Sequence, residues 1–305
     1  MSDENPVETI KVDLSSWAEK VKDKPDFHLI RQAVEVLLTA VSGVPNLRNS
    51  LYLKGGVLMA VAYNSPRMTG DIDFTCVVDP VPGAGQTIEA HLNSAMRRAA
   101  AKLGNPDLLC RVQKIEERPR DWSKGTFEKG PALSMTVGIA RQGTHQAELL
   151  QEKKSPHVLR LDISYKEPIG SFQEIIIEGS EHSVKAYSVT DLIAEKLRAL
   201  LQQITRKHVR YRRQDVFDIA YILNHFSFSD CEAAAVLEAL LLKSTPKGVV
   251  PTPESLRDPQ VKECAAREWE TMQQEIEEQL PDFESCYTQV MNFYESLPWD
   301  KNLAA

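Results

Sequence analysis

The stretch LYLKGGVLMAVAYNSPRMTGDIDF, residues 51–74, decides the fold of this chain. A short apolar run ends at Gly55 and Gly56, and a polar loop then leads into Asp71 and Asp73, which are separated by one apolar residue. Because side chains alternate between the two faces of a strand, both carboxylates point to the same side. Two carboxylates on one face of a partly buried strand repel each other and lose hydration, which is costly unless a cation neutralises them. Oxygen ligands at this spacing suit Mg²⁺ or Mn²⁺. The alternative is a pair of solvated aspartates on an exposed edge strand.

A third carboxylate lies in the apolar run VLRLDISY, residues 158–165, where Asp162 is flanked by Leu161 and Ile163. Asp162 shares its strand face with Arg160, while the apolar residues line the opposite face. This pattern is compatible with a further metal ligand. It is equally compatible with the water-facing side of an ordinary amphipathic strand.

Two later segments with helical spacing carry charged residues on their apolar sides. At about 100° per residue, Lys196 falls inside the apolar arc of its helix, and Asp215 lies on the apolar side of the next helix, with Asp218 at the edge. A lone lysine in such a position usually extends past its neighbours to water. Lys196 and Asp215 could also form a structural ion pair, or line a nucleotide site.

A local concentration of positive charge separates these two helices. Seven Lys and Arg residues occur between Lys196 and Arg213, although the chain as a whole has a net charge of −7. The overall acidity argues against a protein that binds DNA nonspecifically through its whole surface. The basic segment, residues 205–214, is what a polyphosphate or an RNA backbone would require, although such a run is often simply a solvated face.

Composition sets the broad class. The 305 residues are 42% hydrophobic and 26% charged, as in an ordinary globular protein with a full core. The five cysteines are scattered without a C-x-x-C pair, which predicts reduced thiols in a cytoplasmic protein and neither disulfides nor a zinc site. The chain has no evident secretory signal and no apolar run long enough to span a membrane.

The order of apolar patterns predicts a mixed α/β fold followed by a helical C-terminal domain. We expect a flexible N-terminus over 1–24, an α/β domain over 25–185 and a helical domain over 186–305. The expected helices of the first part are 27–41, 56–63 and 87–104, and its expected strands are 51–53, 71–78, 108–115, 132–140, 158–165 and 173–179. In the second part, a break at 251–259 precedes final helices over 261–279 and 282–296.

Four short motifs in this order resemble the AbiEii-type nucleotidyltransferase toxins, the enzymes of AbiE-like type IV toxin–antitoxin systems in the DNA polymerase beta-like nucleotidyltransferase superfamily. The motifs are KGG…R-x-T-G-DIDF, RLDISY, SVTDLIAEKLRALL and RRQDVFDIAYIL, and they span roughly residues 50–225. The resemblance implies a nucleotidyltransferase-like mixed sheet. It also implies an NTP-dependent nucleotidyltransferase that acts as a toxin in phage defence.

The resemblance also implies roles for individual residues. Asp71, Asp73 and Asp162 would be the catalytic carboxylates that hold the divalent metal, with Asp162 activating the attacking hydroxyl. Lys196 and Asp215 match the family's later catalytic Lys and Asp. The implied nucleotide-binding residues are Lys54, Gly55, Gly56, Arg67, Lys196 and Arg213.

The sequence departs from the family in three places. Val57 stands where a threonine usually follows the glycines, Arg213 is one residue further from Asp215 than usual, and the spacer from Gly56 to Asp71 is slightly long. None of these changes removes a metal ligand, so we expect an active enzyme.

The resemblance suggests RNA, specifically tRNA, as the acceptor, and a cognate DNA-binding antitoxin as partner. Two alternatives stay open. The acceptor could instead be a hydroxyl of a protein or a small molecule, or the chain could be a degenerate nucleotidyltransferase that binds nucleotide without turnover.

Overall fold

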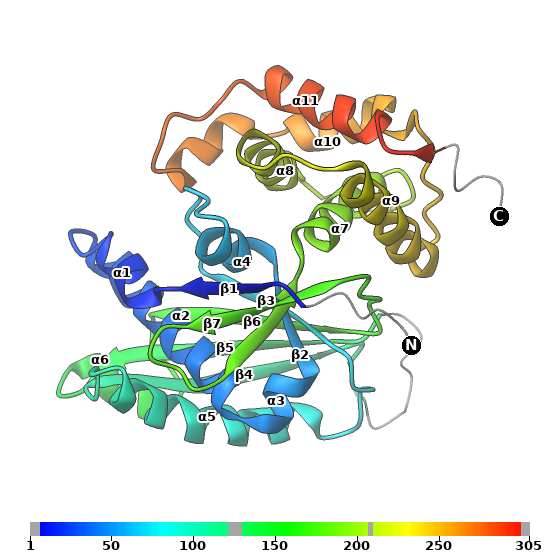
Figure 1. Cartoon of the computed structure of the whole chain (residues 1–305). Helices are drawn as coiled ribbons and strands as arrows, with labels where there is room; N and C mark the ends of the chain where they lie inside the picture. The colour runs from blue at the N-terminus through cyan, green and yellow to red at the C-terminus, as the bar shows by residue number, and fades with distance from the viewer. Residues whose placement is uncertain (1–6, 121, 123–129, 207–209, 300–305) are drawn as a thin grey trace. The chain divides into compact units, whose positions relative to one another are not determined.

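The computed structural model of the chain describes residues 7–120, 122, 130–206 and 210–299 (Figure 1). It divides into two compact units whose boundaries interleave along the sequence. The first unit comprises Met1–Ala62, Thr69–Glu167 and Gln173–Ala186, and the second comprises Tyr63–Met68, Pro168–Phe172 and Tyr187–Ala305. Each unit is described by itself below.

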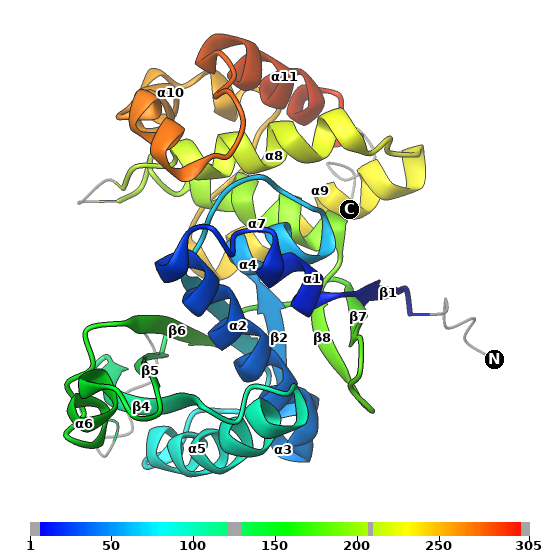
Figure 2. The same ribbon diagram turned by 90° about the vertical axis from the view of Figure 1, so that its left-hand side faces the viewer.

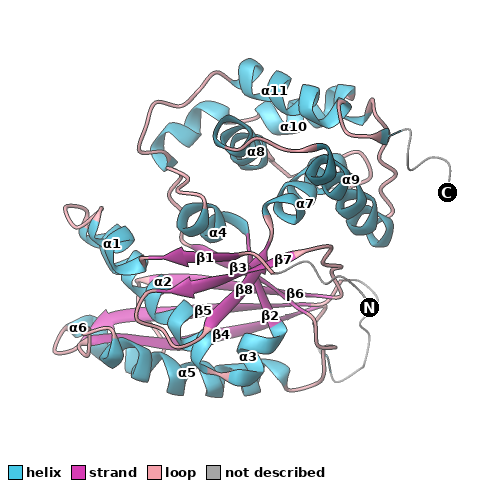
Figure 3. Cartoon of the chain, in the orientation of Figure 1, coloured by secondary structure: helices cyan, strands magenta, loops and turns pink. Residues whose placement is uncertain are grey.

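The first unit is built on a mixed sheet with the strand order β1-β7-β8-β2-β3-β6-β5-β4 (Figure 3). Its strands are β1 (Thr9–Val12), β2 (Leu51–Lys54), β3 (Asp71–Cys76), β4 (Leu108–Arg118), β5 (Ala132–Arg141), β6 (Val158–Tyr165), β7 (Phe172–Ile177) and β8 (Ser183–Tyr187). Strand β3 runs antiparallel to β2 and parallel to β6, so the DIDF motif occupies the middle of the sheet. The prediction of a mixed α/β fold is confirmed.

Alternation along β3 and β6 separates a core face from a polar face. Ile72 and Phe74 are fully buried, as are Leu161 and Ile163 on the neighbouring strand. Helix α2 (Pro25–Gly43) contacts β6, and both α2 and α5 (Ala84–Lys102) contact β4. The aspartates of both strands lie on the other face because they occupy the alternate positions.

Short elements complete the first unit. They are helices α1 (Leu14–Glu19), α3 (Pro45–Ser50), α4 (Gly55–Ala62) and α6 (His145–Gln151). The expectation of a flexible N-terminus does not hold for residues 9–19, because they form β1 and α1. Strand β1 pairs in parallel with β7, and Figure 2 shows these two strands next to β8. The five cysteines are free.

The described part of the second unit is mainly helical, and an isolated bridge joins Arg67 to Ile276. Its helices are α7 (Val189–Leu201), α8 (Arg213–His225), α9 (Asp230–Ser244), α10 (Pro259–Ala266) and α11 (Phe283–Glu295), with short 3-10 turns between them. The predicted helix over 261–279 is wrong in its length. It ends at Ala266, and Glu268 has a φ of 59°, a left-handed conformation that interrupts the α-helix before a 3-10 segment begins at Trp269.

A buried ion pair anchors residues 168–172 to the helices of the second unit. Asp191, in the first turn of α7, is fully buried, and its carboxylate accepts a 2.8 Å hydrogen bond from the backbone N–H of Gly170. The Lys243 ammonium of α9 lies 2.7 Å from the same carboxylate and donates a hydrogen bond to the Pro168 carbonyl. The segment is therefore held by both members of one charge pair.

Candidate active site

The predicted carboxylates lie on the same, polar face of the sheet. Asp73 of β3 lies directly opposite Asp162 of β6 in the parallel register, and Asp71 lies opposite Arg160. Register partners on adjacent strands point to the same face and are separated by about 5 Å between backbones. Asp71 is exposed, whereas Asp73 and Asp162 are half-buried. The structure thus brings Asp73 and Asp162 together, with Asp71 one alternate position along the same strand.

The two glycines form the turn at which β2 ends and α4 begins. Gly55 has a φ of +73°, which disfavours any residue with a side chain. A Cβ atom on Gly55 would lie 3.0 Å from Cγ of Asp73 and still closer to its carboxylate oxygen. The missing side chain therefore lets the backbone at the start of α4 approach the carboxylate directly. Gly56 follows within the first turn of the helix.

Lys54 precedes this turn and is paired across the sheet with Asp73. Its ammonium forms an ion pair with Glu167, and Ser164 lies 3.4 Å from the same nitrogen. Thr75, which is completely buried, donates a 3.3 Å hydrogen bond to Glu167. Glu167 is thus a further carboxylate beside the predicted site. No sequence pattern predicted it, because it lies beyond the end of β6 and belongs to no motif.

Arg67, Lys196 and Asp215 of the second unit take part in one buried network with Asp218. The Arg67 guanidinium donates two hydrogen bonds to the Asp218 carboxylate, at 3.0 and 2.8 Å. The Lys196 ammonium lies 2.6 Å from Asp218 and 3.4 Å from Asp215. The structure therefore contains the ion pair that the sequence analysis considered for Lys196 and Asp215.

Asp218 is the residue of this network that sequence patterns misplaced. Helical spacing set it at the edge of the apolar face, but its side chain is 0% exposed. Burial alone would raise the pKa of Asp218, but the charges of Arg67 and Lys196 outweigh it and hold that pKa below its ordinary value. In the same way, Asp218 overcomes the effect of burial on Lys196 and raises the pKa of its ammonium.

The basic segment over 205–214 is partly paired. Arg213 lies 3.2 Å from Glu275 and 3.8 Å from Glu268, and Arg212 lies 3.2 Å from Asp215. Partial burial, together with the neighbouring arginines, lowers the pKa of Arg206 to about 10. This shift indicates that positive charges are crowded there. Residues 207–209 lie outside the described part of the chain.

Val57, which replaces the family's usual threonine, is fully buried within the first unit. Its side chain packs in the core, so the replacement changes a core contact.

The predicted site residues fall into two groups, one in each unit. The first unit contains Lys54, Gly55, Gly56, Asp71, Asp73 and Asp162. The second unit contains Arg67, Lys196, Arg213 and Asp215.

Among the described residues, no group of three or more His, Cys, Asp or Glu side chains is arranged to hold a metal ion. Within the same residues, no helix has the length and apolar character needed to cross a bilayer.

Sequence comparison identifies the wider relationship. Residues 36–289 match the model of a protein family described as nucleotidyl transferase AbiEii toxin, type IV toxin–antitoxin system. No curated protein matches the chain.

Solved structures share the fold. MenT4, a nucleotidyltransferase toxin from Mycobacterium tuberculosis H37Rv, superposes with a TM-score of 0.55 at 13% identity, over 95% of this chain and 92% of its own. JHP933 from Helicobacter pylori superposes with a TM-score of 0.52 at 15% identity, over 92% of this chain and 96% of its own. At these identities the likeness establishes the fold alone.

Proposed function

Because the chain belongs to the AbiEii nucleotidyl transferase toxin family, we propose that it transfers a nucleoside monophosphate from an NTP to a hydroxyl acceptor in a metal-dependent reaction. The observation that carries this proposal is the pairing of Asp73 with Asp162, with the backbone of Gly55 packed against Asp73. An amphipathic strand with one face exposed to solvent requires neither this carboxylate pair nor the positive φ of Gly55.

The donor set fits a divalent cation that arrives with the nucleotide. Carboxylate oxygens are the ligands that Mg²⁺ and Mn²⁺ prefer. Mg²⁺ is commonly held by one or two carboxylates plus substrate phosphates, without a complete cage of protein ligands. Asp73 and Asp162, with Asp71 beside them, would hold it here. When bound, the cation lowers the pKa of the attacking hydroxyl and neutralises charge on the leaving group.

The reaction needs an in-line attack. The acceptor oxygen bonds to the α-phosphorus, the bond to pyrophosphate breaks, and the hydroxyl proton passes to a base, for which we propose Asp162. Backbone N–H groups of Gly55 and Gly56 at the start of α4 would bind the phosphates, since the N-terminal end of a helix favours anions. Lys54 would stabilise their charge.

The roles of the second unit's residues are proposed from the family. We assign Lys196 and Asp215 to catalysis, and Arg67, Lys196 and Arg213 to nucleotide binding. Each cation already contacts a carboxylate. To bind a phosphate, each cation would therefore have to contact the phosphate and its carboxylate together, or leave the carboxylate.

RNA, in particular tRNA, is the acceptor we propose. The crowded arginines around Arg206 support an anionic partner in a chain that is acidic overall. A protein or small-molecule hydroxyl is the alternative acceptor. We further propose that the chain acts as the toxin of a phage-defence toxin–antitoxin system, with a cognate DNA-binding antitoxin as its partner.

The test uses α-labelled ATP, CTP, GTP and UTP in turn, each with Mg²⁺ and total tRNA. Wild type should label RNA, Asp73→Asn should not, and Asp23→Asn, an exposed aspartate in a turn, should match wild type. Label on protein in place of RNA would establish the alternative acceptor. Binding of an NTP without transfer to any acceptor would contradict the enzyme and favour the degenerate nucleotide-binding protein.

A further inference from the structure

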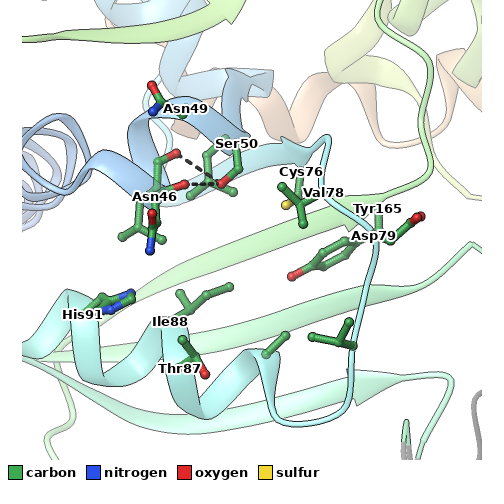
Figure 4. A pocket seen from close by; sticks show the side chains of 14 residues that line it. Asn46, Asn49, Ser50, Cys76, Val78, Asp79, Thr87, Ile88, His91 and Tyr165 are labelled. Atoms are coloured by element: carbon green, nitrogen blue, oxygen red, sulfur yellow. Dashed lines mark hydrogen bonds between the residues drawn. The ribbon is translucent and has the colours of Figure 1, made fainter.

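The first unit contains a cavity at a distance from the carboxylates. It has a volume of about 470 Å³ and lies between α3, the ends of β3 and β6, and the first turns of α5. Figure 4 shows Cys76 and Tyr165 on one side of it, with Ile88, Thr87 and His91 along α5. We call it the β3-end cavity.

The β3-end cavity is separate from the candidate active site, although it shares two strands with it. Cys76 and Tyr165 are register partners, three residues beyond the partners Asp73 and Asp162. Three residues along a strand correspond to about 10 Å and reverse the face on which a side chain lies. A molecule in this cavity would therefore contact the other face and the other end of β3 and β6.

The walls of the cavity are mostly apolar and its size suits a small molecule. Val78 and Val81 line it and are 58% and 54% exposed, so they present apolar surface at its opening. A cavity of roughly 150 Å³ holds benzene, and small-molecule sites span about 300–1,000 Å³. The β3-end cavity thus has room for more than one ring. Only Asp79 and His91 bring ionisable side chains other than the buried Cys76 and Tyr165.

Tyr165 supplies a polar group that lacks a strong partner among the described residues. The residue is 2% exposed, its ring packs edge-on against Trp122, and Figure 4 shows its hydroxyl directed into the cavity. The described side chains offer this hydroxyl one partner, the thiol of Cys76, which is a weak hydrogen-bonding group. Buried tyrosine hydroxyls usually have a better partner.

We propose that the β3-end cavity binds a neutral, ring-containing small molecule whose hydrogen-bond donor pairs with the Tyr165 hydroxyl. The apolar walls favour the ring, and the scarcity of charge disfavours an ionic ligand. This inference goes beyond nucleotidyl transfer and does not depend on it.

Indole is a suitable probe, because it is bicyclic, neutral and carries one N–H. Titration of the full chain by calorimetry should give saturable 1:1 binding with a Kd below about 1 mM, within reach of a ligand of this size. Tyr165→Phe keeps the ring and removes the hydroxyl, and should weaken binding by about 3- to 10-fold. Absence of saturable binding to wild type would overturn the proposal.

Two tryptophan variants locate the site. Thr87 and Gln86 are neighbouring exposed residues of α5, but Thr87 lines the cavity and Gln86 does not. Thr87→Trp should fill the cavity and weaken indole binding by at least about 10-fold, whereas Gln86→Trp should bind as wild type does. Equal affinity in the two variants would contradict this location. Amide shifts at Ile88 in wild type on addition of indole provide a check that depends on no variant.

Discussion

At the scale of single residues, Gly55 joins backbone geometry to the proposed chemistry. Gly55→Ala would place a methyl group against the Asp73 carboxylate and strain a backbone with a φ of +73°. The strain alone costs roughly 1 kcal/mol, but displacement of a metal ligand should reduce nucleotidyl transfer by at least about 100-fold. Initial rates of label transfer to RNA measure the effect.

A matched glycine separates strain from displacement. Gly143 has a φ of +79°, yet no atom lies within 4 Å of the Cβ that an alanine would add there. Gly143→Ala should therefore lower stability by a similar amount and leave transfer unchanged. If both variants lost transfer equally, overlap with Asp73 would not be the cause.

Asp218 gives stability a defined dependence on pH. Its folded-state pKa is held low by Arg67 and Lys196 against the opposing effect of burial. Its stabilisation is therefore complete above the unfolded value of about 3.9 and is lost as pH falls through the lower folded value. Urea unfolding between pH 6 and 2.5 should show this loss in wild type.

The comparison variant is Asp218→Asn, which should be less stable at pH 6 by about 3–5 kcal/mol. Its stability should then fall less steeply than that of wild type below pH 4. The exposed Asp23→Asn variant should follow wild type throughout. Parallel curves for wild type and Asp218→Asn would show that Asp218 is not ionised in the folded protein.

Asp218 also shows what sequence patterns miss at this scale. Helical spacing identified the apolar face of α8, but the burial of Asp218 depends on Arg67, which is 151 positions away in the chain. The DIDF aspartates could be predicted because their alternation is a local property of one strand. Their partner Asp162 was recognised as a candidate, but its register with Asp73 depends on how distant strands pair.

At the scale of elements, long segments with strong periodicity were predicted, as were the short β2 and α4, whereas the short β1, α1 and β8 were not. Helix α2 and strands β3 to β6 carry enough apolar positions to reveal their period. Strand β1 has only four residues, Thr9–Val12, and depends on pairing with β7, so its own sequence carries little information. The early end of α10 follows from the left-handed Glu268, a conformation that its residue type does not indicate.

The pair formed by Asp191 and Lys243 makes a prediction about elements, because it joins α7 to α9. Lys243→Met should destabilise the protein by about 3–5 kcal/mol, since the variant leaves a buried carboxylate without its cation. Adding Asp191→Asn to Lys243→Met should recover a large part of the loss, because no charge then stays buried. Chemical denaturation measures both variants. A double variant less stable than Lys243→Met would show that the hydrogen bonds of Asp191 to Gly170 and Ser171 matter more than its charge.

At the scale of the whole molecule, the two units exchange segments of chain. Residues 63–68 and 168–172 interrupt the sequence of the first unit and belong to the second. Each is held there by a buried charge, the first through Arg67 and Asp218 and the second through Asp191. A boundary drawn once along the sequence, near residue 186, cannot represent this exchange, because hydrophobic periodicity does not report which unit a short loop joins.

The exchange predicts where Arg67→Met acts. Because Arg67 lies between α4 and β3 in the sequence, a local effect would appear in the sheet. The contacts of Arg67 are instead with Asp218 of α8, which also pairs with Lys196 of α7. Hydrogen exchange at the amides of α7 and α8 should therefore become at least about 10-fold faster, whereas β3 and β6 should keep their protection. Arg257→Met is the matched control, since Arg257 also donates two hydrogen bonds to one carboxylate in the second unit but is exposed, so its loss should change little. If instead Arg67 serves only to bind nucleotide, exchange in α7 and α8 should stay unchanged while NTP affinity falls.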